Sequence, residues 1–471
     1  MYNVKSHVAT EFIDDGEILD TLDYAQKNKH NRSLIDGLLE RARDCRGLTH
    51  REAAVLLDCD LPDEVEKMFT LAEEIKLKFY GNRIVLFAPL YLSNYCINSC
   101  VYCPYHCKNK NIARKKLTQE EIAQETIALE NMGHKRLALE AGEDPVNNPI
   151  DYILDSIKTI YSTKSKNGAI RRVNVNIAAT TVEDYRRLKA AGIGTYILFQ
   201  ETYNKKSYEA EHPAGPKSDY AYHTEAMDRA REAGIDDIGC GVLFGLNLYR
   251  YDFVGLLMHA EHLEAATGVG PHTISVPRIC PADDIDPKSF SNAISDETFE
   301  KIVAVLRIAV PYTGMIVSTR ESPKVRERVL QLGISQISGA SRTSVGGYTL
   351  PQRDAASAQF DVSDTRTLDE VIGWLLDLGY IPSFCTACYR SGRTGEHFMK
   401  MVKSAQIASH CHPNALVTLK EYLEDYASSE TKKKGEAMIQ KEIPLLESEG
   451  VRKAVVQHLA DIEHGQRDFR F

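Results

Sequence analysis

Three cysteines near the end of the first quarter of the chain have a spacing typical of iron–sulfur ligands. Cys96, Cys100 and Cys103 form a CxxxCxxC triplet, with an aromatic residue directly before the last cysteine. Iron–sulfur clusters are usually held by four cysteine thiolates. A triplet therefore predicts a four-iron cluster in which one iron has no protein ligand and binds a small molecule instead.

This triplet resembles the cysteine motif of radical S-adenosylmethionine (SAM) enzymes. In those enzymes the open iron binds the amino and carboxylate groups of SAM. The reduced cluster then cleaves SAM to methionine and a 5′-deoxyadenosyl radical, which abstracts hydrogen from the substrate. Zinc is the alternative, but structural zinc usually takes four protein ligands. Cys107 is a further thiol that we expect to be structural, because the triplet is complete without it.

The composition predicts a globular protein of a reducing compartment. The chain has 471 residues, a net charge of −9 and 11 cysteines, an odd number that argues against a fully disulfide-bonded secreted domain. The acidic balance argues against nucleic acid or an anionic membrane as a partner, and no apolar run is long enough to cross a bilayer. We expect a cytoplasmic, oxygen-poor location, since no secretory signal is found and iron-binding thiols must stay reduced.

Strand-like and helix-like segments alternate from residue 83 onward. The expected strands are 83–90, 136–140, 172–177, 195–199, 237–242, 273–276, 314–318 and 335–337. The expected helices between and after them are 118–131, 151–162, 182–191, 220–233, 252–266, 296–310 and 323–332. The alternation predicts a (β/α)₈ TIM-type barrel, with an open doubly wound sheet or a six-stranded barrel as alternatives.

The barrel is expected to span residues 83–345. A helical N-terminal extension over residues 1–82 should precede it, and a helical domain over residues 346–471 should follow it. In a TIM-type barrel the active site lies at the C-terminal ends of the strands, so residues that directly follow a strand are the first candidates.

Several such residues are expected to bind SAM. The end of the second strand resembles the GGE motif of radical SAM enzymes, which binds the SAM amino group, although an alanine replaces the first glycine; on its own it would be an ordinary glycine turn. The residues of this segment are Glu140, Ala141, Gly142 and Glu143. The other expected SAM contacts are Tyr102 in the cysteine loop, Gln200 and Glu201 after the fourth strand, and Gly241 in the fifth.

Two arginines follow later strands of the barrel. Arg278 comes after the sixth strand and Arg320 after the seventh. A planar guanidinium at this position suits a substrate carboxylate, because it offers two parallel hydrogen bonds. The alternative for either arginine is an ion pair with Glu201 or Glu321.

A second cysteine triplet lies far downstream. Cys385, Cys388 and Cys411 form a CxxCx₂₂C pattern, which would again leave one iron of a four-iron cluster open. A CxxC pair is also typical of redox and zinc sites. The possible fourth ligands of a zinc site are His397, His410 and His412.

Taken together, these motifs resemble one family, the HydG radical SAM tyrosine lyases that mature [FeFe]-hydrogenases. The resemblance covers essentially the whole chain. Besides both triplets it rests on Tyr91–Cys96, Pro271–Arg278, Ser318–Ser322 and Ser335–Arg342. The tyrosine lyase of thiamine biosynthesis shares several of these segments but lacks the C-terminal triplet, so the triplet favours HydG.

The resemblance implies a specific chemistry. The adenosyl radical takes a hydrogen from the amino group of L-tyrosine, the Cα–Cβ bond breaks, p-cresol leaves, and the remaining dehydroglycine is converted to carbon monoxide and cyanide. An auxiliary four-iron cluster, linked through an amino acid (expected to be cysteine) to a labile fifth iron, captures both molecules. The product is an Fe(CO)₂(CN)–cysteine precursor of the hydrogenase H-cluster, with other hydrogenase maturases as acceptors.

With this resemblance, we expect Arg320 to bind the tyrosine carboxylate, with Arg278 as the second candidate. His272 precedes the sixth strand and should lie at the N-terminal end of the barrel, which the C-terminal cysteine arm could close. We expect His272 to bind the labile iron, because neutral imidazole is a good iron ligand. The alternative for His272 is an ordinary structural histidine.

Two other functions remain possible from the residues alone. A thiazole-pathway tyrosine lyase would release p-cresol and dehydroglycine without carbon monoxide or cyanide. A scaffold protein that carries zinc or a cluster would cleave no SAM.

Overall fold

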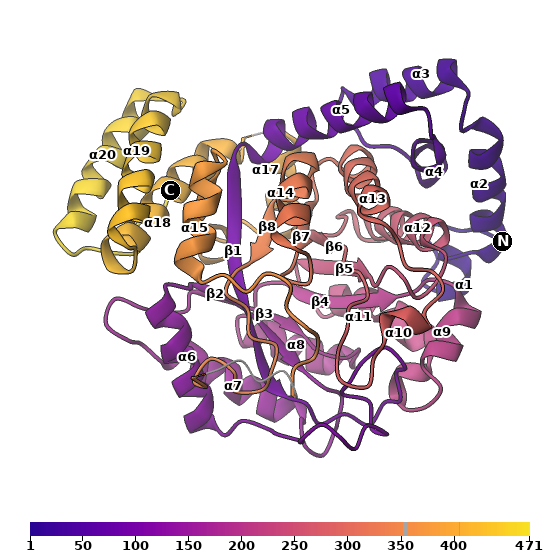
Figure 1. Cartoon of the computed structure of the whole chain (residues 1–471), viewed down its shortest axis with the longest axis horizontal. Coiled ribbons are helices and arrows are strands. Elements are labelled where there is room, and N and C mark those ends of the chain that lie inside the picture. The colour runs from indigo at the N-terminus through magenta and orange to yellow at the C-terminus, as the bar shows by residue number, and fades with distance from the viewer. Residues whose placement is uncertain (352–356, 405) are drawn as a thin grey trace.

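A closed parallel β-barrel forms the centre of the structure (Figure 1). This computed structural model describes residues 1–351, 357–404 and 406–471. The barrel strands are β1 (Arg83–Ser93), β2 (Arg136–Ala141), β3 (Arg172–Asn176), β4 (Tyr196–Glu201), β5 (Ile238–Val242), β6 (Thr273–Ser275), β7 (Gly314–Val317) and β8 (Gln336–Ser338). Each strand pairs in parallel with the next, and β1 pairs with both β2 and β8, which closes the sheet. The predicted TIM-type barrel is confirmed, and both alternative sheets are wrong.

The barrel strands lie close to the predicted segments, because buried strands are apolar and are easily recognised in the sequence. All residues of β5 and β7 are buried. Strands of a parallel barrel are covered on both faces and therefore appear in the sequence as nearly continuous apolar runs.

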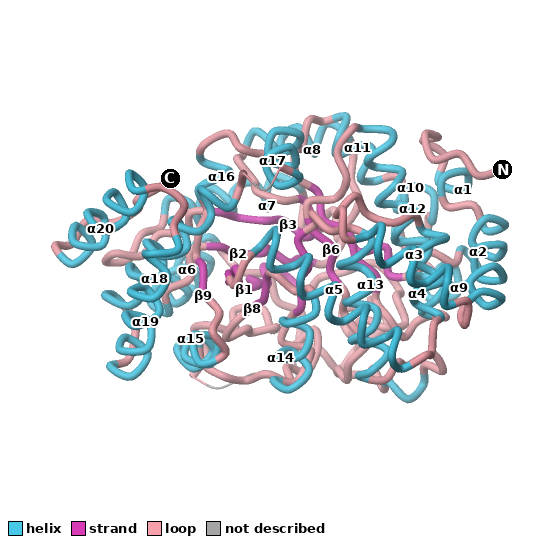
Figure 2. Tube along the Cα trace, turned by 90° about the horizontal axis from the view of Figure 1, so that it is seen from above, coloured by secondary structure: helices cyan, strands magenta, loops and turns pink. Residues whose placement is uncertain are grey.

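Helices surround the barrel, as Figure 2 shows. They are α6 (Gln119–Met132), α7 (Ile150–Ser162), α8 (Val182–Ala190), α9 (Lys205–Glu211), η1 (Pro216–Ser218), α10 (Tyr220–Thr224), α11 (Ala226–Glu232), α12 (Tyr249–Thr267), η2 (Pro287–Ser289), α13 (Asp296–Ala309) and α14 (Pro323–Leu332). Thr118 and Glu121 form a capping box at the start of α6. The single helix predicted over residues 220–233 is split in two at Glu225.

An N-terminal group of helices covers one side of the barrel. Its members are α1 (Ala9–Phe12), α2 (Asp15–Asn28), α3 (Arg32–Ala42), α4 (His50–Asp58) and α5 (Pro62–Tyr80). Helix α5 packs against α13, and α2 and α4 pack against α12. The sequence predicts helices over residues 34–43, 50–57 and 63–79, which correspond to α3, α4 and α5, but it does not predict α2.

The C-terminal region adds a ninth strand and a group of helices. These elements are α15 (Leu368–Asp377), β9 (Ile381–Ser383), α16 (Ala387–Arg390), α17 (Gly395–Lys403), α18 (Ala408–Asp425), α19 (Ser429–Glu442), η3 (Ile443–Leu445) and α20 (Glu449–Glu463). Helices α18, α19 and α20 lie at the opposite side of the molecule from the N-terminal helices (Figure 1).

Strand β9 determines where the second cysteine triplet lies. It pairs in parallel with β1 from Arg83 to Val85, whereas β2 pairs with β1 from Ala88 onward. Since Val85 also pairs with β8, β9 occupies the N-terminal part of the edge that β1 shares with β2. The chain that leaves β9 therefore begins at the N-terminal end of the barrel, as expected for the cysteine arm.

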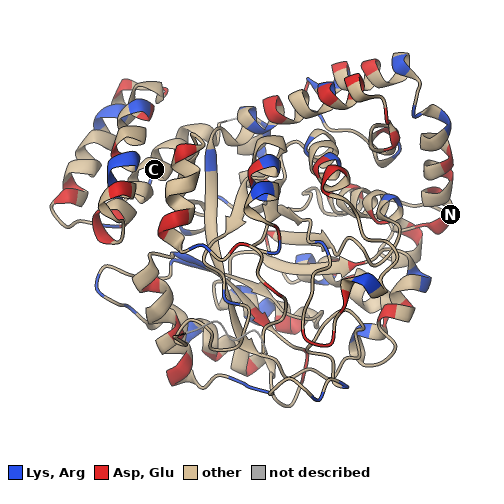
Figure 3. Cartoon of the chain, in the orientation of Figure 1, with Lys and Arg blue, Asp and Glu red and all other residues tan. Residues whose placement is uncertain are grey.

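Among the helices of the described residues, none is long and apolar enough to cross a membrane. Acidic and basic side chains are interspersed along the outer helix α5 (Figure 3).

Candidate functional site

One cavity opens at the C-terminal ends of the strands and is lined by all three cysteines of the first triplet, Cys96, Cys100 and Cys103. Burial raises the pKa of each thiol, to about 11 for Cys103, so the thiols stay protonated until a metal displaces the protons. Three thiols that line one cavity fit a four-iron cluster with one open iron. Cys107 does not line this cavity and contacts the Ser99 hydroxyl at 3.4 Å instead.

Gly142 holds the cysteine loop close to the end of β2. A Cβ atom at Gly142 would lie 2.3 Å from the carbonyl oxygen of Tyr95 and 3.0 Å from the Cβ of Cys96. The Gly142 N–H also donates to the Ser93 carbonyl at 3.0 Å. Only glycine permits such a close approach of two backbones. The glycine of the GGE-like segment is therefore required by packing against the loop that carries Cys96.

Replacing Gly142 with alanine is expected to displace that loop and to lower the iron and sulfide content of the reconstituted protein. The clash is with backbone, so its relief costs on the order of 1–3 kcal/mol. Gly37→Ala in α3 is the control, because no atom lies within 4 Å of a Cβ added there. Iron analysis after anaerobic reconstitution measures the effect; equal iron in the two variants would contradict this role of Gly142.

Acidic side chains give the cavity hydrogen-bond acceptors. Glu140 accepts from Asn176 at 2.8 Å, and burial raises the pKa of its carboxyl to about 8. Glu143 accepts from Asn98 at 2.6 Å, and burial raises its pKa as well. Such acceptors suit an ammonium group or ribose hydroxyls. Both glutamates line the cavity as expected, together with Ala141.

Glu201 and Tyr102 also line the cavity. Lys217 donates to Glu201 at 2.8 Å, and the Tyr102 hydroxyl is hydrogen-bonded to His212 at 2.7 Å. Lys217 is a cavity residue that the sequence analysis missed. It lies in η1, between two helices, and no strand end indicated it.

Two expected SAM contacts do not reach the cavity. Gln200 is buried and donates to Thr224 at 2.9 Å. Its neighbour Glu201 lines the cavity, whereas Gln200 does not. Gly241 provides space for the ring of Phe199, which would lie 2.5 Å from an added Cβ. Neither Gln200 nor Gly241 lines the cavity, and contact of these two residues with SAM stays a prediction.

The guanidinium of Arg320 lies at this end of the barrel. It lies over the ring of Phe360 at 3.7 Å and donates to the Cys280 sulfur at 3.5 Å. It lines the cavity, as do Tyr91 and Glu140. Within the described part of the chain, no carboxylate lies within ion-pair distance of Arg320. A half-buried guanidinium without a carboxylate partner is suited to bind an anionic ligand.

Arg278 lies outside the cavity. Its guanidinium binds the carboxylate of Glu321, with one N–O distance of 3.0 Å, and that of Asp296 at 2.9 Å. It also lies over the ring of Phe299 at 4.7 Å. The ion pair with Glu321, given as the alternative for Arg278, is present, and binding of the substrate carboxylate by Arg278 stays a prediction.

A second cavity lies at the N-terminal ends of the strands and is lined by Cys385, Cys388, Cys411 and His272. His272 directly precedes β6, and its backbone N–H donates to the Ile238 carbonyl at 2.8 Å. Burial lowers the pKa of the imidazole to about 4, so the side chain is neutral and able to bind a metal. Three thiols and an imidazole around one cavity form a donor set that suits iron.

Three arginines surround this second cavity, and the sequence analysis missed them. Arg83, Arg136 and Arg172 are the first residues of β1, β2 and β3, and all three line the cavity. Arg136 donates to the Cys385 carbonyl at 2.7 Å. An arginine at the start of three successive strands was the available signal, because the starts of parallel strands meet at one end of a barrel.

The positive charges also act on the thiols. The Cys411 thiol has a pKa of about 5, well below its usual range. The hydrogen bond from the Cys388 thiol is the largest cause of this decrease, and the positive charge of Arg83 lowers the pKa further. None of the histidines proposed as a fourth zinc ligand lines this cavity: His397, His410 and His412. His412 instead pairs with Glu442 at 3.0 Å.

Comparison with known proteins agrees with this arrangement. The model of the radical SAM superfamily matches residues 90–258, and that of the biotin and thiamin synthesis associated domain matches residues 275–381. The 2-iminoacetate synthase of Escherichia coli (strain K12) is 30% identical over 346 residues, which cover 73% of this chain and 89% of that protein.

Two solved structures match over nearly the full length. The crystal structure of HydG, a maturase of the [FeFe]-hydrogenase, is 55% identical, with a TM-score of 0.95 and coverage of 98% of this chain and 100% of that chain. HydG from Carboxydothermus hydrogenoformans is 40% identical, with a TM-score of 0.84 and coverage of 96% and 100%. The radical SAM match implies a four-iron cluster and SAM at the first triplet. The chain belongs to the HydG family of radical SAM [FeFe]-hydrogenase maturases.

Proposed function

We propose that this chain cleaves L-tyrosine between Cα and Cβ to p-cresol and dehydroglycine, converts dehydroglycine to carbon monoxide and cyanide, and assembles an Fe(CO)₂(CN)–cysteine precursor of the H-cluster. The observation that carries the proposal is the pair of three-cysteine cavities at opposite ends of one barrel. The similarity to 2-iminoacetate synthase supports the first step, since 2-iminoacetate is another name for dehydroglycine. Other hydrogenase maturases are the proposed acceptors of the product.

In the first cavity, the cluster and SAM supply the hydrogen-abstracting radical when they are bound. Arg320 is proposed to bind the tyrosine carboxylate, because its guanidinium lines the cavity and is oriented by the ring of Phe360. Glu140, Glu143 and Glu201 offer acceptors for the ammonium and hydroxyl groups of SAM. The buried lining keeps water away from the reacting atoms, which protects a reactive intermediate from side reactions.

In the second cavity, we propose that Cys385, Cys388 and Cys411 hold the auxiliary four-iron cluster and that His272 binds the labile iron. That iron and its bridging cysteine are cargo, because they leave in the product. The arginines at the starts of β1, β2 and β3 suit this cargo, since cyanide and an amino acid carboxylate are both anions.

The test is an anaerobic assay of the iron-reconstituted protein with SAM, L-tyrosine and reductant, in which p-cresol, carbon monoxide and cyanide are measured together. Release of all three is the expected result. Release of p-cresol alone would contradict the maturase chemistry and indicate a thiazole-pathway lyase, which the second triplet disfavours. Absence of SAM cleavage would indicate a scaffold protein.

His272→Ala is expected to remove the labile fifth iron and to lower the yield of carbon monoxide, while p-cresol release is retained. The reason is that His272 lines only the second cavity. Iron per chain and carbon monoxide yield are the measurements. His412→Ala is the matched control, because His412 pairs with Glu442 outside that cavity. An unchanged iron content and carbon monoxide yield in His272→Ala would rule out this ligand.

A further inference from the structure

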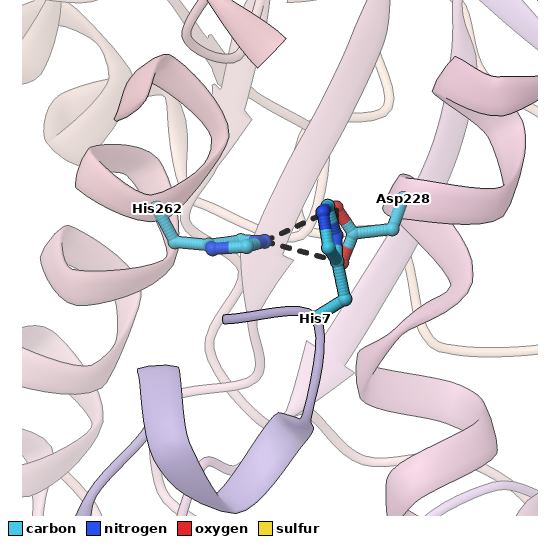
Figure 4. Close-up of side chains that lie close together, drawn as sticks. All are labelled: His7, Asp228 and His262. Carbon is cyan, nitrogen blue, oxygen red and sulfur yellow. Dashed lines mark hydrogen bonds and ion pairs between the residues drawn. The ribbon is translucent and has the colours of Figure 1, made fainter. Parts of the chain in front are cut away.

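Three potential metal ligands meet on the outside of the barrel, apart from both cavities. His7 precedes α1, Asp228 lies on α11 and His262 lies on α12, and Figure 4 shows their side chains converging. One ligand atom of each lies within 4.8 Å of the others. These residues come from three separate elements, so the cluster exists only in the folded chain.

The distances are those of ligands around a single ion. Asp228 carboxylate oxygens lie 3.1 Å from Nε2 of His262 and 3.3 Å from Nδ1 of His7. A zinc ion binds imidazole nitrogen and carboxylate oxygen at about 2.0–2.2 Å, which places two tetrahedral ligands about 3.3 Å apart.

The hydrogen bonds of His262 point to a cation. This buried ring contacts the Val4 carbonyl through Nδ1 at 2.8 Å and both Asp228 oxygens through Nε2 at 3.1 Å. A neutral imidazole has only one N–H, so when Nδ1 donates to Val4, Nε2 directs a lone pair at a carboxylate. A metal ion bound to both Nε2 of His262 and the Asp228 carboxylate would remove the repulsion between the lone pair and the carboxylate charge. Donation from the other ring nitrogen to a backbone carbonyl is also the usual way in which a metal-bound histidine is oriented.

The surrounding contacts hold the ligands in place. The ring of Phe12 stacks on His262 with the centroids 3.9 Å apart. The N–H of Ala9 donates to Glu225 at 2.9 Å, which fixes the segment that carries His7.

We propose that His7, Asp228 and His262 bind one divalent transition-metal ion, with Zn²⁺ as the expected occupant, and that this ion holds the N-terminal segment against α11 and α12. Two imidazoles and one carboxylate are a donor set that suits Zn²⁺, which accepts a tetrahedral site without a preference of its own for another geometry. The fourth position is open to water. The site is separate from the proposed lyase chemistry and has a structural role.

The experiment measures zinc and iron per chain in the full-length, anaerobically reconstituted protein after equilibration with Zn²⁺ and removal of unbound metal. His7→Ala tests an exposed ligand whose loss should not prevent folding, and Asp228→Asn keeps the size of the side chain. His30→Ala is the matched control, since His30 is an exposed histidine that pairs with the carboxylate of Asp60.

About one zinc per chain is expected to be lost in His7→Ala and Asp228→Asn relative to both the wild type and His30→Ala, with iron unchanged. Crystals of the wild type should show an anomalous peak at the zinc edge between Asp228 and His262. Equal zinc in His7→Ala and His30→Ala, or no peak at this position, would overturn the proposal. Neither readout depends on tyrosine cleavage, so the result stands apart from the proposed function.

Discussion

Cys388→Ala is expected to abolish carbon monoxide release and assembly of the iron product, while p-cresol release continues at a rate close to that of the wild type. Cys388 lines the cavity at the N-terminal ends of the strands, and the first cysteine triplet lines the cavity at their C-terminal ends. Removing one of only three thiolates should prevent the auxiliary cluster from forming. Changes at distant sites that share no contacts have nearly independent effects.

The reciprocal variant makes this result interpretable. Cys103→Ala should lose SAM cleavage and all products together, since the proposed cleavage of tyrosine depends on the first cavity. Cys45→Ala is the control for loss of a thiol, because Cys45 lies in the N-terminal extension, outside both cavities. Iron, SAM cleavage, p-cresol and carbon monoxide are measured on the same samples. Wild-type carbon monoxide from Cys388→Ala would contradict the proposed role of the second triplet.

The barrel could be predicted from the sequence because its eight strands are apolar segments separated by helices of ordinary length. Strand β9 could not be predicted in the same way. It has three residues, one of them Pro382, and it pairs with only the first part of β1. Its existence depends on an edge left open by the later start of β2, which is a tertiary feature that local sequence patterns do not contain.

In the candidate site, too, features set by the local sequence could be predicted, and features set by the tertiary structure could not. The cysteine triplets were predicted because ligand spacing is a local property of the chain. Gln200 does not line the cavity, whereas Glu201, at φ 68° and next to an irregularity in the pairing of β4 with β5, does. Arg136 and Arg172 were missed because their convergence depends on strand register.

Arg320→Lys is expected to raise the KM for tyrosine by about 10- to 100-fold, the equivalent of losing one charge-assisted hydrogen bond of about 1.5–3 kcal/mol. The guanidinium of Arg320 is planar and lies over Phe360 at 3.7 Å, which orients two parallel N–H groups. A lysine ammonium keeps the charge but offers no such pair of donors. The KM for SAM should change little, because the expected change concerns only the tyrosine carboxylate.

Arg278→Lys is the matched control for this substitution. Both arginines directly follow a barrel strand, but Arg278 is already occupied by the carboxylates of Glu321 and Asp296. Its replacement should leave the tyrosine KM near the wild-type value, whatever it does to stability. An unaltered KM in Arg320→Lys, with an increase in Arg278→Lys, would transfer the carboxylate to Arg278 and require the ion pair with Glu321 to open when tyrosine binds. The comparison thus separates a preformed anion site from one that forms only with the substrate.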